Sequence, residues 1–282
     1  MSVRIVIDSA CDITKEKADA LRLDFMPLKT LFGEEEYLDG ITITHKEFYE
    51  KLIECGTIPT TSQIPPYDFE KKFREIKESG DTAVVITLSS LLSGTYQSAV
   101  LALNGYEDCI CLVDSLNVSI GEQNLVHYAV CLREQGLSAR EIAAELDRKK
   151  SDICVLALFD TLEYLKQGGR ISKTAAWAGG VLSIKPVISV IKGEVAILGK
   201  ARGSKNGNNM LIQQVNQSGG IDFSMPYCLG YTGLDDALLQ KYIRDSAALW
   251  EGKTDSLPIT TIGSVIGTHA GPGAIGVSYF HL

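Results

Sequence analysis

Short β-rich runs alternate with helical patterns through the first half of this chain. Two of the helix starts have capping boxes, Thr44-x-x-Glu47 and Ser138-x-x-Glu141, whose hydroxyl and carboxylate satisfy free amides of the first turn. Strand and helix in alternation are typical of a mostly parallel sheet with helices on both faces, so we expect an α/β fold here. The expected strands are residues 4–7, 82–88 and 109–113, and the expected helices are residues 14–21, 44–55, 66–79, one from about 95 and one ending at 135.

The second half changes to a hairpin pattern. Short strands joined by tight turns predict a second α/β domain with a mixed, partly antiparallel sheet. The length of 282 residues fits two domains, which we place at residues 1–155 and 156–282. The expected strands are residues 153–158, two within 186–198 around Lys192-Gly193, 227–232, and a final pair at 259–265 and 274–280.

Charge, hydropathy and cysteine usage exclude several classes of function. The 27 Lys and Arg against 35 Asp and Glu give a net charge of -8, which repels a nucleic-acid backbone. The apolar runs are far shorter than the roughly 18 residues that cross a bilayer, and no signal-peptide pattern opens the chain. The 7 cysteines are typical of reduced thiols, and no Cys/His cluster predicts a metal site. We expect a cytoplasmic protein with no membrane span, no nucleic-acid partner, no metal and no cofactor.

Two hydroxyl-rich loops are candidates for binding an anion. Residues 89–95 follow an expected parallel strand and residues 60–66 precede an expected helix. Ligands of open parallel sheets bind where strands end and helices begin. In residues 89–95 the hydroxyl of Ser93, free backbone amides and the helix dipole form an anion cradle, and Gly94 allows the backbone to approach a ligand closely; residues 60–66 offer the same chemistry. Ordinary helix capping is the alternative for either loop alone.

Nucleotide and hydrolase motifs do not explain these loops. The chain has no GxxxxGK[ST], and its GxGxxG match at residues 271–276 precedes an expected strand instead of a helix. The absence of a GxSxG elbow disfavours an acyl hydrolase with Ser93 as nucleophile and His269 as base, which stays open as an alternative. His269 lies in the glycine-rich segment 267–273, where an imidazole could donate to an anion.

Two arginines lie beside glycines, in Gly168-Gly169-Arg170 and in Arg202-Gly203. Such turns predict exposed guanidinium groups that a partner or a phosphate can use. Solvated surface arginines are the alternative.

Taken together, these blocks resemble the DegV family of bacterial fatty-acid-binding proteins. Two positions depart from the family pattern: Ile64 is inserted before Pro65-Pro66, and Ala270 stands where threonine is frequent. The matching residues occur in family order along nearly the whole chain: Asp8-Ser9, Asp12, Thr61-Ser62-Gln63, Ser89-Ser90, Leu92-Ser93-Gly94-Thr95, Asp114-Ser115, Leu162-Glu163-Tyr164-Leu165, Gly168-Gly169-Arg170, Lys185-Pro186, Arg202-Gly203, and His269 with Gly271-Pro272-Gly273.

The resemblance implies one long-chain fatty acid in a tunnel between two α/β domains. It also implies a non-catalytic role as the acyl-binding component of a fatty acid kinase system, in which a separate ATP-binding subunit converts the carboxylate to acyl-phosphate. Such a carrier could touch a membrane surface transiently. Carried over by position, the carboxylate ligands are the hydroxyls of Thr61 and Ser93, the backbone amides of Ser62 and Gly94, and His269, while Arg170 and Arg202 lie on the rim where the kinase docks.

Three hypotheses follow for the function. The first is this fatty-acid carrier, the second is the stand-alone serine acyl hydrolase, and the third is a protein that binds a small anion without an acyl tail.

Overall fold

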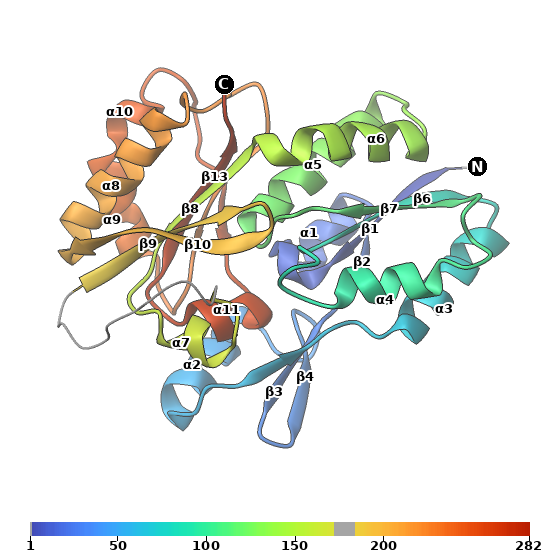
Figure 1. Ribbon diagram of the computed structural model, residues 1–282, viewed down its shortest axis with the longest axis horizontal. Coiled ribbons are helices and arrows are strands. Elements are labelled where there is room, and N and C mark those ends of the chain that lie inside the picture. Colours follow the sequence, from blue (N-terminus) through green and yellow to red (C-terminus); the bar gives the residue numbers. More distant parts are fainter. Residues whose placement is uncertain (1, 172–183) are drawn as a thin grey trace.

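A four-stranded parallel sheet organises the first half of the computed structural model, which describes residues 2–171 and 184–282. Its strand order is β2-β1-β6-β7, formed by Asp24–Met26, Val3–Asp8, Thr82–Thr87 and Ile110–Asp114. Successive residues of β1 point to opposite faces, because side chains alternate along a strand. Ile5 and Ile7 pack toward helices α5 (Ile120–Glu134) and α6 (Ala139–Lys149). Val6 packs toward α3 (Pro66–Glu78) and α4 (Thr95–Ala102), which confirms helices on both faces (Figure 1).

A six-stranded mixed sheet organises the second half, as predicted. All neighbouring pairs are antiparallel except β11 and β12, which are parallel. The strand order is β10-β9-β8-β13-β11-β12, formed by Glu194–Arg202, Ile184–Ile191, Ile153–Leu158, Ile275–Phe280, Tyr227–Tyr231 and Ile259–Thr261. The predicted domain boundary at residue 155 lies inside β8, and the division into two domains stays a prediction.

Helices cover both faces of this second sheet. One face packs against α8 (Gly203–Gln217), α9 (Ala237–Asp245) and α10 (Ala247–Trp250). The other face packs against α5, which therefore contacts both sheets. No helix in residues 2–171 or 184–282 has both the length and the apolar character needed to cross a membrane.

The capping boxes lie where the sequence predicts them. Thr44 and Glu47 cap α2 (His45–Cys55), and Ser138 and Glu141 cap α6. The remaining short helices among the described residues are α1 (Lys15–Ala20), α7 (Glu163–Gln167), α11 (Ser264–Ala270) and the 3-10 turns Ser9–Cys11 and Lys150–Asp152.

A third, small sheet was not predicted. It pairs β3 (Lys29–Phe32) with β4 (Glu35–Leu38) and with β5 (Thr60–Ser62), all antiparallel. Gly33 has a φ of 62° and forms the β3–β4 turn. Residues 60–62, interpreted from sequence as a loop, are thus a strand, because tertiary pairing with β3 determines the conformation of a segment too short to show a period.

The predicted final strand pair is wrong in part. Residues 259–265 do not form one strand: β12 ends at Thr261, and α11 (Ser264–Ala270) begins three residues later. Strands β12 and β13 also do not pair with each other, because β11 lies between them.

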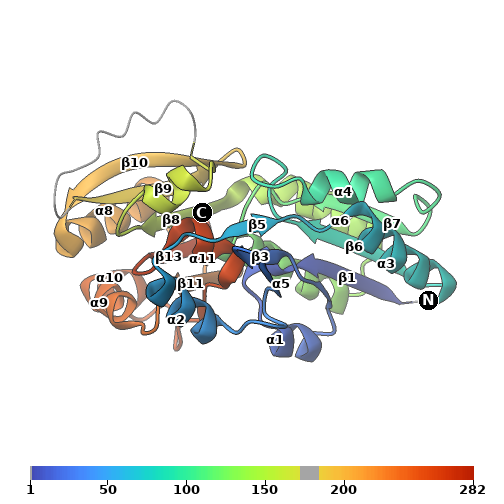
Figure 2. The same cartoon turned by 90° about the horizontal axis from the view of Figure 1, so that it is seen from below.

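Two buried carboxylates fix the start of α11. Asp39 accepts hydrogen bonds from the backbone nitrogen of Ser264 at 2.8 Å and from its hydroxyl at 2.7 Å. Asp12 accepts one from the backbone nitrogen of Gly263 at 2.7 Å. Figure 2 shows α11 in the middle of the molecule beside β3 and β5. Residues near the start of the chain therefore position a helix near its end.

We predict that Asp39→Ala lowers the free energy of unfolding by about 2 kcal/mol or more, since it leaves the buried backbone amide of Ser264 unpaired, while the hydroxyl of Ser264 keeps Thr30 as a partner. Urea denaturation would measure the change. As the control, Glu36→Ala removes an exposed carboxylate paired with Lys29 and is expected to cost at most about 1 kcal/mol. Equal stability of the two variants would contradict the anchoring role of Asp39.

Candidate ligand-binding cavity

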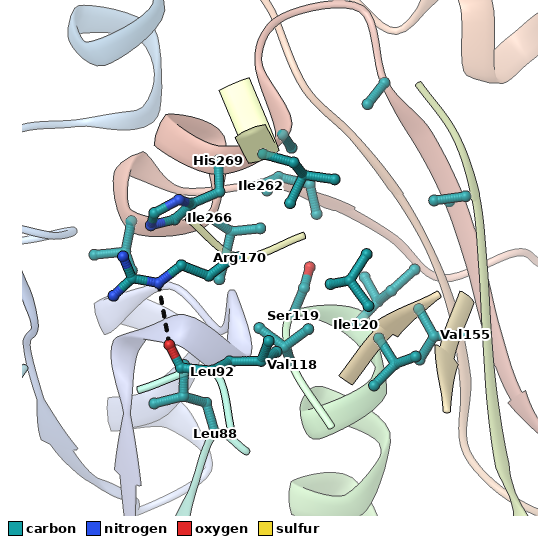
Figure 3. A pocket seen from close by; sticks show the side chains of 18 of the residues that line it. Leu88, Leu92, Val118, Ser119, Ile120, Val155, Arg170, Ile262, Ile266 and His269 are labelled. Atoms are coloured by element: carbon teal, nitrogen blue, oxygen red, sulfur yellow. Dashed lines mark hydrogen bonds between the residues drawn. The ribbon is translucent and has the colours of Figure 1, made fainter. Parts of the chain in front are cut away.

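A cavity of about 420 Å³ lies where the two sheets meet (Figure 3). Its wall includes Leu88, directly after the carboxyl end of β6, the position that the parallel-sheet rule predicts. Most of its lining is apolar and comes from both halves of the chain: Leu28, Leu88, Leu92, Val118, Ile120, Val155, Ala157, Phe159, Leu165, Ile188, Val190, Val195, Ile262, Val265, Ile266, Ala270, Ala274 and Ile275.

Several polar residues gather at one end of this cavity, while Ser119, beside Ile120, and Thr232 add further hydroxyl groups to the wall. The structure brings all five predicted carboxylate ligands to its wall: Thr61, Ser62, Ser93, Gly94 and His269. The hydroxyl oxygen of Thr61 lies 3.0 Å from Nε2 of His269, so β5 and α11 meet here through a hydrogen bond. That these residues bind a carboxylate stays a prediction.

Two glycines allow side chains to approach the backbone at this polar end. A Cβ atom on Gly168 would lie 2.1 Å from Nδ1 of His269, and one on Gly94 would lie 2.0 Å from Oε1 of Gln63. The sequence predicts that a ligand approaches the backbone at Gly94. In the structure, the side chain of Gln63 lies against Gly94, and its amide nitrogen donates to the hydroxyl of Ser98 at 2.8 Å. Gln63 therefore joins the two hydroxyl-rich segments.

The glycine-rich surroundings of His269 suggest a loop. In the structure, His269 lies instead in the last turn of α11. Its Nδ1 atom is buried without a hydrogen-bond partner among the described residues. Burial, with the nearby charge of Arg170, lowers the pKa of His269 from the ordinary 6.5 to about 4. The ring is therefore neutral at physiological pH.

Arg170 differs from the exposed guanidinium that its sequence predicts. It is half-buried and lines the cavity, with Nε donating to the carbonyl of Leu92 at 3.2 Å and Nη1 to that of Gly168 at 2.6 Å (Figure 3). The flanking glycines turn the chain inward, so that these carbonyl groups hold the cation at the polar end. Arg202 is exposed, as predicted, at the end of β10 and just before α8, and it is not part of the cavity wall.

The two residues that depart from the family pattern, Ile64 and Ala270, are both buried. Ile64 is 2% exposed and packs in the core beneath α3. Ala270 is buried and contributes to the cavity wall.

Ser93 and His269 do not form a nucleophile–base pair. The Ser93 hydroxyl lies 3.0 Å from that of Thr95 at the start of α4, while His269 bonds to Thr61. No hydrogen bond joins Ser93 to His269 within the described part of the chain, and covalent acyl transfer depends on such a bond.

We predict that the His269 ring stays neutral down to about pH 5 and protonates near pH 4, as followed by nitrogen NMR of the imidazole. The unfolded chain protonates this residue near pH 6.5, so the contribution of His269 to stability falls as the pH decreases from 6.5 to 4. Replacing Arg170 by Met should raise the pKa of His269, because a positive neighbour is removed. The matched Arg202→Met variant should leave it unchanged, and a wild-type midpoint near 6.5 would contradict the assignment.

Comparison with known proteins places the chain in a family. The family model described as "Uncharacterised protein, DegV family" matches residues 2–282. A fatty acid-binding protein of Thermotoga maritima is 30% identical over 98% of this chain and 96% of its own length. The solved structure of a fatty-acid-binding DegV family protein from Thermus thermophilus has a TM-score of 0.89 at 31% identity, covering 100% of both chains. That of a stearic acid-binding protein from Eubacterium ventriosum has a TM-score of 0.85 at 31% identity, covering 99% of this chain and 97% of the other. The chain therefore belongs to the DegV family.

Proposed function

We propose that this protein binds a long-chain fatty acid, with the carboxylate at the polar end of the cavity and the acyl tail along its apolar wall. The observation that supports this most is the lining of one cavity, since the hydroxyl of Thr61, the imidazole of His269 and the guanidinium of Arg170 belong to a wall that is otherwise largely apolar. Its relatives from Thermus thermophilus and Eubacterium ventriosum are described as binding fatty acid and stearic acid. The proposed head-group ligands are Thr61, Ser62, Ser93, Gly94 and His269.

The energetics favour an acyl tail as the source of affinity. Burying roughly sixteen methylene groups at about 0.8 kcal/mol each gives on the order of 12 kcal/mol before the entropy of binding is subtracted. A carboxylate removed from water costs several kcal/mol unless donors replace its hydration. The neutral donors around Thr61 and Ser93, with the charge of Arg170 nearby, supply that replacement.

We further propose that the bound acid is presented to a separate ATP-binding kinase subunit that forms acyl-phosphate. Arg202 is exposed at the end of β10, so a partner could contact it directly. Arg170 lies at the polar end of the cavity, so the partner and the ligand could both contact it. A partner that consumes ATP also implies the cytoplasm as the working compartment. In this proposal the chain itself catalyses no reaction.

The two alternatives fit the cavity less well. An acyl hydrolase requires a base directed at its nucleophile, whereas His269 is bonded to Thr61. A small anion would occupy the polar end only and would leave most of the apolar wall in contact with water, at a cost in free energy.

We predict that the protein purified without added lipid carries a long-chain acid detectable by native mass spectrometry, released intact and not as a hydrolysis product. Thr61→Ala and Ser93→Ala should each weaken binding of added oleic acid by about 1 to 3 kcal/mol, because a buried charged group loses one donor. Ser90→Ala, an exposed position in the same loop as Ser93, is the control and should bind like wild type. Stabilisation by inorganic phosphate but by no acid would favour the small-anion hypothesis, and release of free acid from an added ester would favour the hydrolase.

We predict that substitutions of Arg170 and Arg202 have different effects on fatty-acid affinity and on the rate of acyl-phosphate production. Arg170→Ala should reduce both fatty-acid affinity and acyl-phosphate production, because this cation lines the cavity. Arg202→Ala should reduce acyl-phosphate production and leave affinity within about 0.5 kcal/mol, as for other surface changes. Titration with acid and a coupled kinase assay would measure the two quantities. Unchanged turnover in Arg202→Ala would make it a solvated side chain without a docking role.

A further inference from the structure

We infer that Gly230 and Gly276 set the size limit for the acyl tail, because together they hold open the part of the cavity between Ile120 and Ile262. This inference rests on the proposed function and names the residues that would decide which acids are accepted.

The two ends of the cavity can be told apart by the direction of α11. His269 lies in the last turn of this helix at the polar end, and Ile262 lies two residues before its first turn. At about 1.5 Å per helical residue, these two positions are separated by roughly 10 Å. Figure 3 shows Arg170 and Leu92 on one side of the cavity and Ile120 and Val155 on the other. The region around Ile120 and Ile262 is therefore remote from the predicted carboxylate ligands.

Gly230 and Gly276 lie directly opposite each other on β11 and β13. Side chains alternate along a strand, and the neighbours Leu229 and Val277 belong to the core on the far side of the sheet. The glycines consequently face the cavity, and both are part of its wall. Two residues that face each other on neighbouring strands normally cover the sheet with their side chains, but Gly230 and Gly276 contribute no side-chain atoms to the cavity wall.

The space in front of both glycines is limited by isoleucine side chains. A Cβ atom on Gly230 would lie 2.8 Å from Cδ1 of Ile262 and 3.0 Å from Cγ2 of Ile120. One on Gly276 would lie 3.0 Å from Cδ1 of Ile120. A single added methyl at either position must therefore push these side-chain ends, and both isoleucines line the cavity, so we expect the displacement to reduce the space for a tail.

The backbone does not require glycine at either position. Both residues lie within regular paired strands, and neither has the positive φ that favours glycine. Glycine inside a strand weakens the strand, and it is typical of sites where a ligand or another chain segment approaches closely. At both positions glycine lets the isoleucine side chains pack directly against the strands, and in the proposed function this leaves the cavity beyond them to the tail.

The test is competition between saturated acids of different length. Wild type, Gly230→Ala and Gly276→Ala would each be stripped of lipid, offered equal amounts of dodecanoic, palmitic, stearic and eicosanoic acid, and examined by native mass spectrometry. We expect the ratio of bound stearic to bound dodecanoic acid to fall about tenfold in each glycine variant, the usual cost of one methyl too many in a packed interior. Ile262→Val removes a methyl from the same region and should raise the ratio of eicosanoic to palmitic acid.

Val277→Ala is the matched control, since this buried residue neighbours Gly276 on β13 but packs away from the cavity. It should lower thermal stability and leave the acid ratios unchanged. The inference is overturned if the glycine variants and Ile262→Val keep the wild-type ratios, or if all acids are weakened equally. A wild-type protein that binds none of the acids overturns the proposed function itself, which distinguishes the two failures.

Discussion

The site depends on the hydrogen bonds that Asp12 and Asp39 accept at the start of α11. Both carboxylates are buried, and burial raises the pKa of each, so their ionised forms are stable only while backbone and hydroxyl donors surround them. Gly263 and Ser264 supply those donors. A shift of α11 would remove these hydrogen bonds and leave Asp12 with the hydroxyl of Ser119 as its remaining side-chain donor, so the position of His269 is fixed by groups remote from it in the sequence.

The polar end of the cavity contains neutral hydrogen-bonding groups and one cation, Arg170, which the protein itself holds in place. Two nitrogens of Arg170 donate to the carbonyl groups of Leu92 and Gly168, so the guanidinium is fixed before any ligand arrives. Its charge also disfavours protonation of His269, which keeps the pKa of the imidazole low. A carboxylate placed here would be stabilised by a preorganised field and by hydroxyl groups, without a dedicated salt bridge. In the proposed function, an oxygen held in this way can still attack a phosphate.

The parts predicted from sequence are those that local rules determine. The capping boxes at Thr44 and Ser138 and the alternation of the parallel strands depend on neighbouring residues, and they lie where predicted. Helix α11 and strand β5 were missed because they are short and are stabilised by distant partners, Asp39 for α11 and Thr30 for β5. The inward turn of Arg170 was missed for the same reason, since the carbonyl of Leu92 lies 78 residues away in sequence.

The apolar wall could not be predicted at all. Residues that surround the cavity, such as Ile120 and Ile262, have the same composition and period as those that fill the core. Glycine in a strand was the only local signal, and its meaning depends on the register of β11 against β13, which the sequence does not display.

The low pKa of His269 explains why the chemistry is assigned to a second protein. An effective general base has a pKa near the working pH, whereas the imidazole here protonates only near pH 4. Forming the imidazolium at neutral pH would therefore cost about 3 kcal/mol more than in an unperturbed histidine. Ser93, bonded to Thr95, has no better base beside it among the described residues. The burial that lowers the pKa of His269 makes this end unsuited to activating a nucleophile, which is consistent with the proposed function, in which another protein brings the phosphate.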